Sequence, residues 1–221
     1  KRVLKHTDLY VDIGAKDRAD AEKRVGRGDY ISFTTKFSHF GEGLVRGKAL
    51  DDRVGCAILL ELLRGSYQCD LWAVFTVQEE LGLRGATVTA ARVQPDVALI
   101  LEGTTANDMA ETPSHRSVTT VGAGAAISFM DGRTIVPEKM VATLRGAAMR
   151  EGIPWQMRKG TAGGTDAGAI HRSLAGVVCG GISVPCRYIH SPVSVASVAD
   201  IEAAYRLAAT FLQQNLFHEV L

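Results

Sequence analysis

The sequence predicts an α/β protein in which a mostly parallel sheet lies between layers of helices. After Gly47, segments with apolar residues at helical spacing alternate with short apolar runs, which is typical of a layered α/β domain. The composition agrees, because 46% hydrophobic and 22% charged residues over 221 positions is the balance of a protein that buries a core. The first 46 residues have a different pattern of apolar and polar residues, so we expect two domains, residues 1–46 and residues 47–221.

Two strands and one helix are predicted in the first 46 residues. Apolar and polar side chains alternate over residues 9–14 and 30–37, which predicts strands, and residues 17–25 have helical spacing. So short a stretch cannot hold a core alone, and we expect a small β-rich unit. Glycines 41, 43 and 47 then interrupt the chain, which places the domain boundary between residues 46 and 47.

Helices and buried strands alternate in the rest of the chain. Helical spacing predicts helices over residues 54–63, 83–92, 137–151 and 198–213. Short apolar runs predict buried strands over residues 71–77, 96–101, 125–129 and 174–184. Because helices separate these strands along the chain, we expect most of the strands to be parallel.

Composition excludes several classes of protein. Lysine plus arginine is 25 and aspartate plus glutamate is 24, with no basic stripe, so we expect no nucleic-acid partner. Apolar runs fall far short of the roughly 18 residues that span a membrane, so we expect no membrane partner. None of the four cysteines has C-x-x-C spacing, and Cys56 and Cys179 lie in apolar runs, which indicates thiols in a reducing, cytoplasmic setting. The chain opens at Lys1 without an initiator methionine, so we expect a longer protein of which this is a part.

Carboxylates and one histidine follow the predicted strands or precede a helix. Taken singly, they have ordinary explanations as helix caps, solvated loop charges, a strand-end carboxylate and a loop histidine. Together they would crowd negative charge at the edge of the sheet where ligands bind. Crowded carboxylates repel one another, and a bound divalent cation usually compensates for this repulsion. Oxygen ligands with a histidine suit zinc, manganese or cobalt. The residues are Asp51, Asp52, Glu79, Glu80, Glu102 and His190.

The adjacent pair Glu79 and Glu80 is the most informative of these clusters. Neighbouring residues just past a strand can point in different directions, so one can bind metal while the other faces a water molecule on that metal. A metal lowers the pKa of bound water, and a free carboxylate can then take its proton. This division of roles is typical of a hydrolase.

Four motifs occur in a fixed order: KALDDRVG at 48–55, VQEELGLRGA at 77–86, GGTDA at 163–167 and PCRYIHSP at 185–192. In this order they resemble the dinuclear metal aminopeptidases of the glutamyl and deblocking aminopeptidase family. The segment DLYVDIGA at 8–15 is similar to the same family, and the resemblance covers essentially the whole chain. It implies a zinc-peptidase-like catalytic domain and a homo-oligomer, a dodecamer in this family. Some members carry a cellulase or endoglucanase label.

The resemblance also implies roles for individual residues. Asp51 would bridge two divalent metal ions, and the family allows a cis bond between Asp51 and Asp52. Glu80 and His190 would bind the second metal with Asp51. Glu102 would bind the first metal with Asp51, although many relatives have aspartate at that position. Zinc is the first choice for both metals, with cobalt or manganese as alternatives.

The remaining implied roles concern proton transfer and the lining of the site. Glu79 would be the general base. Asp52 and Arg187 are grouped with residues that support the site or contact the substrate. The glycines of the GGTDA motif would allow close backbone approach, and its aspartate is a supporting polar group rather than a ligand. The residues of that motif concerned are Gly163, Gly164, Thr165 and Asp166.

One family feature is missing from this sequence. The family takes a first-metal histidine from an H-x-D motif well upstream of the segment at 8–15. Here the residues His6, Thr7 and Asp8 have the H-x-D pattern, but they lie directly at that segment rather than well upstream of it. We therefore do not expect His6 to be a ligand. We therefore expect a complete second metal site and an incomplete first one. By the same resemblance, residues 1–46 are a remnant of a dimerisation-type domain, and residues 47–221 are a catalytic domain without its first strands.

The implied activity is removal of the N-terminal residue from a peptide with a free N-terminus, by water activated between two metals. Three alternatives stay open. A related metallohydrolase, such as a carboxypeptidase or deacetylase, could use the same arrangement. A non-catalytic peptide-binding or assembly subunit is compatible with the missing histidine. A glycosidase would need two carboxylates on either side of the scissile bond, which an adjacent pair such as Glu79 and Glu80 does not supply.

Overall fold

The computed structural model describes residues 4–221, and these form two compact units. One unit extends to Thr34, and the other runs from Thr35 to Leu221. The division precedes the predicted boundary at residues 46 and 47, because residues 35–46 include two strands that join the sheet of the larger unit.

Over residues 4–34, the smaller unit contains two short helical segments and no strand: η1 (His6–Asp8) and α1 (Arg18–Glu22). Asp17 caps α1, since its side chain accepts a hydrogen bond from the backbone N–H of Asp20. The strands predicted over residues 9–14 and 30–37 are wrong. Alternation alone does not make a strand, because a strand also needs a partner, and here the side chains stay in solvent: Tyr10 is 89% and Tyr30 102% exposed.

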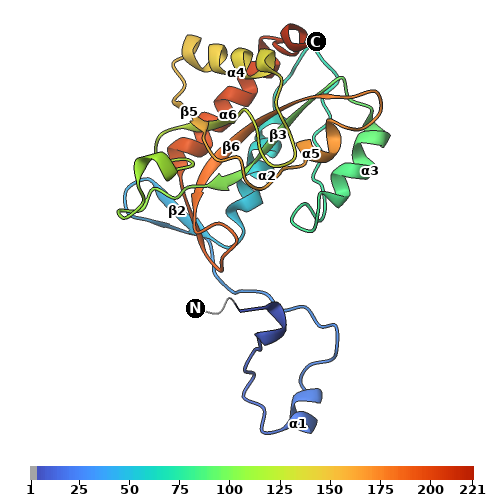
Figure 1. The fold of residues 1–221 in the computed structure, drawn as a ribbon, viewed down its shortest axis with the longest axis vertical. Helices are drawn as coiled ribbons and strands as arrows, with labels where there is room; N and C mark the ends of the chain where they lie inside the picture. The colour runs from blue at the N-terminus through green and yellow to red at the C-terminus, as the bar shows by residue number, and fades with distance from the viewer. Residues whose placement is uncertain (1–3) are drawn as a thin grey trace. The chain divides into compact units, whose positions relative to one another are not determined.

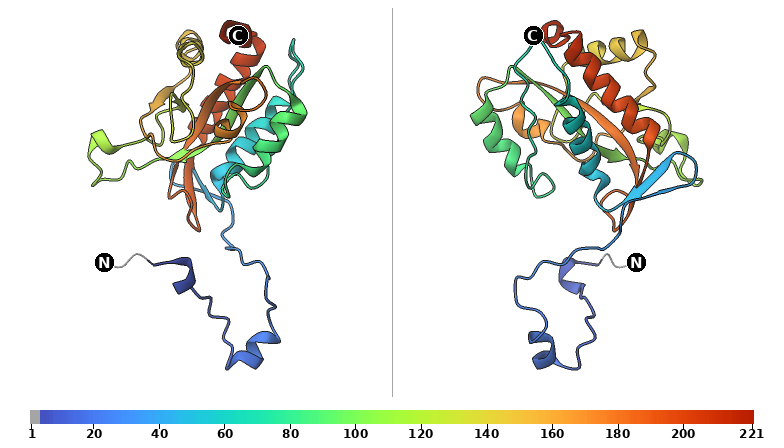
Figure 2. Two further views of the ribbon diagram at one scale, coloured as in Figure 1. Left: turned by 45° about the vertical axis from the view of Figure 1, so that its right-hand side comes forward. Right: turned by 180° about the vertical axis from the view of Figure 1, so that it is seen from behind.

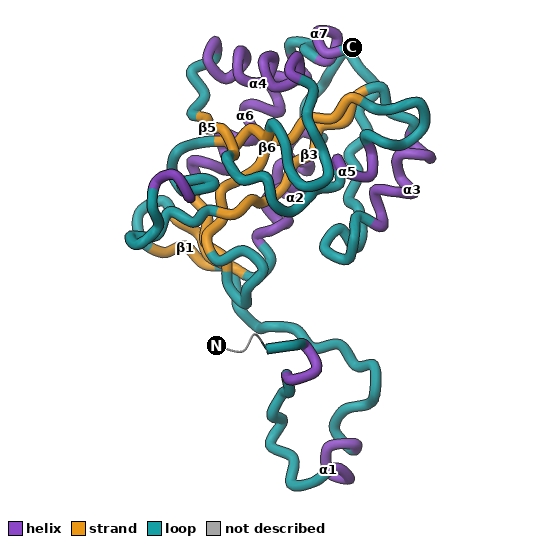
Figure 3. The backbone as a smooth tube through the Cα atoms, in the orientation of Figure 1, coloured by secondary structure: helices purple, strands orange, loops and turns teal. Residues whose placement is uncertain are grey.

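A seven-stranded sheet forms the centre of the larger unit (Figure 1). Its main path runs in the order β1-β2-β7-β6-β4-β5, and β3 pairs with β6. Figure 3 shows β3 and β6 as the long strands in the middle of the unit. The strands are β1 (Ser38–Phe40), β2 (Leu44–Gly47), β3 (Val97–Thr105), β4 (Ala125–Ser128), β5 (Trp155–Arg158), β6 (Val178–Arg187) and β7 (Ser194–Ser197).

The sheet is mixed, and the expectation of a mostly parallel sheet is wrong. The pairs β3·β6 and β4·β5 are parallel, whereas β1·β2, β2·β7, β4·β6 and β6·β7 are antiparallel. Short loops join β1 to β2 and β6 to β7, and such hairpins force antiparallel pairing. The α4 crossover between β4 and β5 permits a parallel pair. The short strands β1, β2, β5 and β7 carry too little apolar pattern to have been predicted.

Helices cover both faces of the sheet, as the predicted α/β class requires. One face packs against α2, α4 and α6 through residues such as Ile127, Ile182, Leu144 and Phe211, and Figure 2 shows α2 and α6 lying across that face. The opposite face packs against α5 around Ile100, and α3 packs on α5. The helices are α2 (Leu50–Leu62), α3 (Arg84–Val93), α4 (Glu138–Arg150), α5 (Ala167–Ile170), α6 (Val198–Gln213) and α7 (Phe217–Val220), with η2 (Ser114–Arg116).

The four helices predicted in this unit are confirmed as α2, α3, α4 and α6, and three of the four buried strands are confirmed as β3, β4 and β6. The strand predicted over residues 71–77 is wrong, because this segment forms no strand pairing. Its side chains are largely in solvent; Trp72 and Val77 are each 67% exposed. No helix in the described part of the chain, residues 4–221, has the length and hydropathy needed to cross a membrane.

Candidate active site

Two consecutive aspartates open α2 and face different partners. The chain enters the helix through Ala49, which has a positive φ of 53°, and the peptide bond between Asp51 and Asp52 is cis. Asp52 Oδ1 accepts a hydrogen bond of 3.0 Å from the backbone N–H of Gly55, so this carboxylate caps the helix. The carboxylate of Asp51 is left to face the loop that follows β6.

The adjacent glutamates lie in a tight turn just before α3. Backbone hydrogen bonds run from Leu81 N to Gln78 O and from Gly82 N to Glu79 O, which fixes the turn. Glu80 points toward His190. The charged group with the largest effect on the pKa of Glu79 is instead Asp166. The two carboxylates of the pair therefore have different neighbours.

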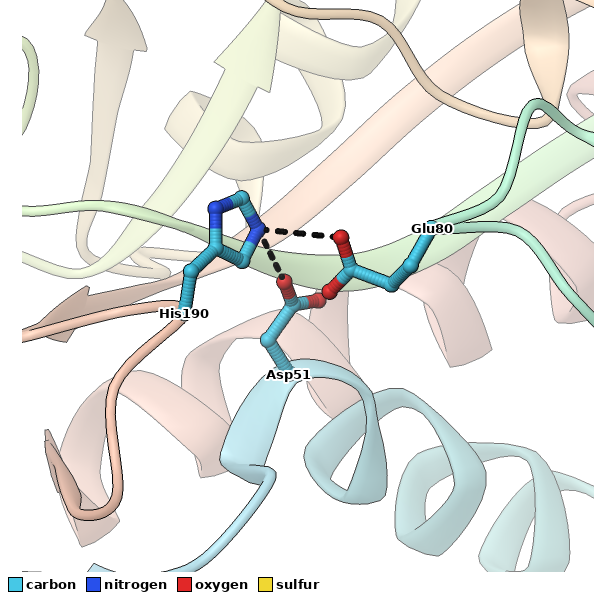
Figure 4. A group of neighbouring side chains, drawn as sticks. All are labelled: Asp51, Glu80 and His190. Atoms are coloured by element: carbon cyan, nitrogen blue, oxygen red, sulfur yellow. Dashed lines mark ion pairs between the residues drawn. The ribbon is translucent and has the colours of Figure 1, made fainter. Parts of the chain in front are cut away.

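Asp51, Glu80 and His190 form a group that could hold a metal ion (Figure 4). His190 Nε2 lies 3.3 Å from Asp51 Oδ2 and 3.2 Å from Glu80 Oε2. One potential ligand atom from each residue lies within 4.8 Å of the others. His190 comes from the loop between β6 and β7 and has a positive φ of 60°. Among residues 4–221, no other group of three such side chains is brought together in this way.

Glu102 lies on β3 beside this group and is not part of it. Its charged neighbours are Asp51, Asp52 and Glu79, with Arg158 as the compensating cation. Gly103 next to it lets the start of α2 pack against β3, because a Cβ atom there would come within 2.9 Å of Asp51 Cβ. His6, the only histidine upstream of residue 8, belongs to the smaller unit and is exposed.

Burial and mutual repulsion raise the pKa values of the clustered carboxyl groups. Desolvation, followed by the charge of Glu80, raises the pKa of Asp51 to about 6. Desolvation, followed among the raising effects by the charge of Asp51, raises the pKa of Asp52 to about 8. Desolvation and then the Asp166 charge raise the pKa of Glu79 to about 7, and desolvation raises the pKa of Glu102 well above its usual value. Carboxylates that repel one another in this way, with an imidazole nitrogen beside them, fit a divalent cation.

The raised pKa of Asp52 predicts a pH-dependent stability. Between the ordinary value of 3.8 and about 8, the folded chain binds more protons than the unfolded chain, so stability falls as the pH rises. In metal-free protein we expect Asp52→Asn to raise the free energy of unfolding by roughly 1–3 kcal/mol at pH 8 and by little at pH 4. Urea unfolding at both pH values measures this. The exposed Asp70→Asn is the matched control, and an equal effect of Asp52→Asn at both pH values would contradict the prediction.

Arg187 is engaged by an acidic partner from another loop. Its Nε and Nη2 donate to Asp108 Oδ1 and Oδ2 at 2.7 and 2.8 Å, a bidentate pair that holds the pKa of Asp108 below its usual value. Asp108 also accepts from the backbone N–H of Val121. Arg187 thus fixes the end of β6, from which the His190 loop departs, against the loop after β3.

The GGTDA motif forms the turn that leads into α5. Gly163 has a positive φ of 81°, and a Cβ atom at Gly164 would come within 2.4 Å of Arg133 Cγ, so both positions favour glycine. Thr165 Oγ1 accepts from the backbone N–H of Ala167. Asp166 accepts from the hydroxyl of Thr76 through Oδ2, and its buried Oδ1 has no hydrogen-bond partner.

Sequence reasoning missed the contacts made by Arg158 and Asp108. Arg158 Nε donates to Thr104 Oγ1 at 2.9 Å, and its guanidinium also donates to the carbonyls of Gly160 and Ala162. It thereby ties the loop before the GGTDA motif to the end of β3, beside Glu102. No pattern in the sequence signals this contact, because Arg158 and Thr104 lie far apart in the chain.

Comparisons with known proteins show which family the chain belongs to. Residues 1–207 match the family described as M42 glutamyl aminopeptidase. An aminopeptidase candidate from Acetivibrio thermocellus is 39% identical over 206 residues, which are 92% of this chain and 62% of that protein. The TET aminopeptidase from the marine sediment archaeon Thaumarchaeota archaeon SCGC AB-539-E09 has a TM-score of 0.92 and 36% identity, covering 97% of this chain and 62% of that one.

A third relative, the TET1 peptidase of Pyrococcus horikoshii, can assemble into a tetrahedron or a large octahedral shell. Its TM-score is 0.81 at 28% identity, over 97% of this chain and 63% of that one. The chain thus spans about three fifths of the length of these relatives. Because the family match extends over residues 1–207, the chain belongs to the M42 glutamyl aminopeptidase family.

Proposed function

We propose that this chain carries the main part of the active site of a metal-dependent aminopeptidase. The observation that supports the proposal most directly is the group formed by Asp51, Glu80 and His190, with the carboxylate of Glu79 beside it. Family membership and relatives named as aminopeptidases point to the same activity. Since the chain spans about three fifths of those relatives, the activity of the whole protein is part of the proposal.

Asp51, Glu80 and His190 would hold one divalent cation, and Asp51 with Glu102 would hold a second. One nitrogen and several carboxylate oxygens suit zinc, with cobalt or manganese as alternatives. Such ions, when bound, polarise the scissile carbonyl and lower the pKa of a water molecule. The second set is the less complete one, because Glu102 does not join the group of three and no histidine of residues 4–221 stands with it.

Glu79 is the group that moves the proton. In the metal-free chain, burial and then the charge of Asp166 raise its pKa to about 7, so this carboxyl group can both take up and release a proton near neutral pH. It takes the proton of the attacking water and delivers it to the leaving amine. Asp166 supports this role from the GGTDA turn, since its charge helps to raise the pKa of Glu79.

A substrate panel tests the proposed reaction. We expect the chain to release the N-terminal residue of unblocked peptides, to spare the same peptides after N-acetylation, and to spare acetyl-lysine substrates. Chelation should abolish the activity, and zinc, cobalt or manganese should restore it. Release of C-terminal residues or of acetate would assign the chain to a related metallohydrolase. Metal binding without any turnover would indicate a non-catalytic peptide-binding or assembly subunit.

Two further properties belong to the same proposal. We propose a homo-oligomer, because the Pyrococcus horikoshii relative assembles into closed particles. We also propose a cytoplasmic location, because all four cysteines are free, as is usual for proteins of a reducing compartment.

A further inference from the structure

The loop that carries His190 has little in its own structure to hold it in place. It joins β6 to β7, and the paired residues that close it are Arg187 and Val195. Tyr188 and His190 have positive φ angles of 57° and 60° although neither is glycine, and this conformation costs free energy. The imidazole of His190 is 62% exposed, so packing does little to fix it. Its orientation therefore depends on contacts between the loop and other parts of the chain.

Arg187 ties the base of this loop to Asp108, which follows β3. Its Nε and Nη2 donate to the two carboxylate oxygens of Asp108 at 2.7 and 2.8 Å, and a bidentate pair fixes orientation as well as distance. The carboxylate of Asp108 is only 8% exposed, which shields the pair from the solvent that weakens surface ion pairs. A second contact lies beside the first, since Tyr188 Oη donates to Met109 Sδ at 3.6 Å.

The segment that holds Asp108 is itself anchored. Asp108 Oδ2 also accepts from the backbone N–H of Val121 at 3.0 Å. The residues that follow are held by Asp200, which is buried at the start of α6 and accepts from the backbone N–H groups of Gly122 and Gly124 at 2.6 and 2.7 Å. Because α6 packs into the main core, the contacts form a continuous connection from the core through Asp108 to the loop after β6.

We propose that Asp108 is a positioning residue for the metal ligand His190 and that it acts through Arg187. The pair holds the base of the loop so that the imidazole faces Asp51 and Glu80 before a cation arrives (Figure 4). Loss of either partner releases the loop, and the affinity for the cation falls with the fraction of molecules in which the imidazole is in place. This proposal rests on the proposed function, because it requires the group of three to hold a cation, but it does not require turnover.

A double-mutant cycle in zinc affinity tests the proposal. Zinc is titrated calorimetrically into the metal-free 221-residue chain and into Asp108→Asn, Arg187→Gln and the double variant. We expect each single variant to weaken zinc binding by about 10–100-fold, the range found when a residue that orients a metal ligand is lost. The double variant should be no weaker than the weaker single variant, because its second change removes a contact that the first has already broken.

The direction of the two effects separates positioning from simple attraction between charges. Asp108→Asn removes a negative charge and Arg187→Gln removes a positive one, so charge alone would weaken zinc binding in the first and strengthen it in the second. Positioning weakens it in both. Glu61→Gln is the matched control, because Glu61 is paired with Arg64 at 3.1 Å on the surface and loses the same charge as Asp108→Asn. Its zinc affinity should stay within about twofold of that of the unmodified chain.

Amide exchange in metal-free protein shows whether the loop is released. We expect residues 188–191 to exchange roughly tenfold faster in Asp108→Asn than in the unmodified chain, while residues 178–184 of β6 stay equally protected, which also shows that the variant folds. Arg187→Lys is the milder variant for the case in which Asp108→Asn unfolds. Lysine keeps the charge but lacks the planar fork of donors, so zinc binding should still weaken, by about threefold or more.

Three results would overturn this proposal while zinc binding is still lost in His190→Ala. They are unchanged zinc affinity in the Asp108 and Arg187 variants, stronger binding in Arg187→Gln, and losses that add in the double variant. Unchanged zinc affinity in His190→Ala is a different failure, because it would show that the cation binds elsewhere and would overturn the proposed function as well.

Discussion

Replacing Glu79 by glutamine is expected to lower kcat by about 10²–10⁴-fold while metal binding is retained. Glutamine keeps the size of the side chain and can still accept a hydrogen bond, but it cannot take up a proton. Metal binding should survive because Glu79 lies outside the group formed by Asp51, Glu80 and His190. Steady-state kinetics on an unblocked peptide, together with metal content per chain, measures both effects.

The matched control for this variant is Glu138→Gln, which changes an exposed glutamate at the start of α4. It should leave kcat unchanged. Wild-type turnover in the Glu79→Gln protein would show that another group acts as the base. A loss of both metal and turnover would place Glu79 among the ligands instead.

Replacing His190 by alanine is expected to weaken zinc binding by roughly 100-fold or more. Residues that merely orient a ligand already cost 10–100-fold when they are lost, and His190 supplies the single nitrogen of the group. The variant also leaves the carboxylates of Asp51 and Glu80 facing one another without the imidazole between them. Calorimetric titration of metal-free protein with zinc measures the change in affinity.

His115→Ala is the control for the histidine variant, because His115 is exposed in η2 and belongs to no group of potential ligands. Its zinc affinity should equal that of the unmodified chain. An unchanged affinity in His190→Ala would show that zinc binds elsewhere. A loss caused only by unfolding would appear as a changed circular dichroism spectrum before zinc is added.

The helices of the larger unit could be predicted because their patterns depend on local spacing. α4 and α6 were expected within a residue of their observed bounds, since apolar positions recur over several turns. The segment at residues 71–77 shows where local pattern fails. Its composition is that of a strand, but whether a strand forms depends on a partner that no local pattern identifies. The predicted direction of the strands is wrong for a related reason. Whether two strands are parallel depends on whether a short loop or a crossover connects them, which local pattern does not reveal.

The candidate site could be predicted in part. Motif order drew attention to Asp51, Glu80 and His190 together, and the structure brings these three side chains within reach of one cation. The contacts of Arg187 with Asp108 and of Arg158 with Thr104 could not be foreseen, because they join residues far apart in the chain that share no pattern. Whether Glu102 completes a second metal set stays a prediction.

The three members of the ligand group come from widely separated parts of the larger unit: the start of α2, the turn before α3 and the loop after β6. A cation bound to all three would act as a reversible cross-link that closes long loops of the chain. Closing such loops reduces the freedom of the unfolded chain far more than that of the folded one. Opening of any one segment would then cost the ion a ligand, so bound metal should suppress the local opening of all three segments at once.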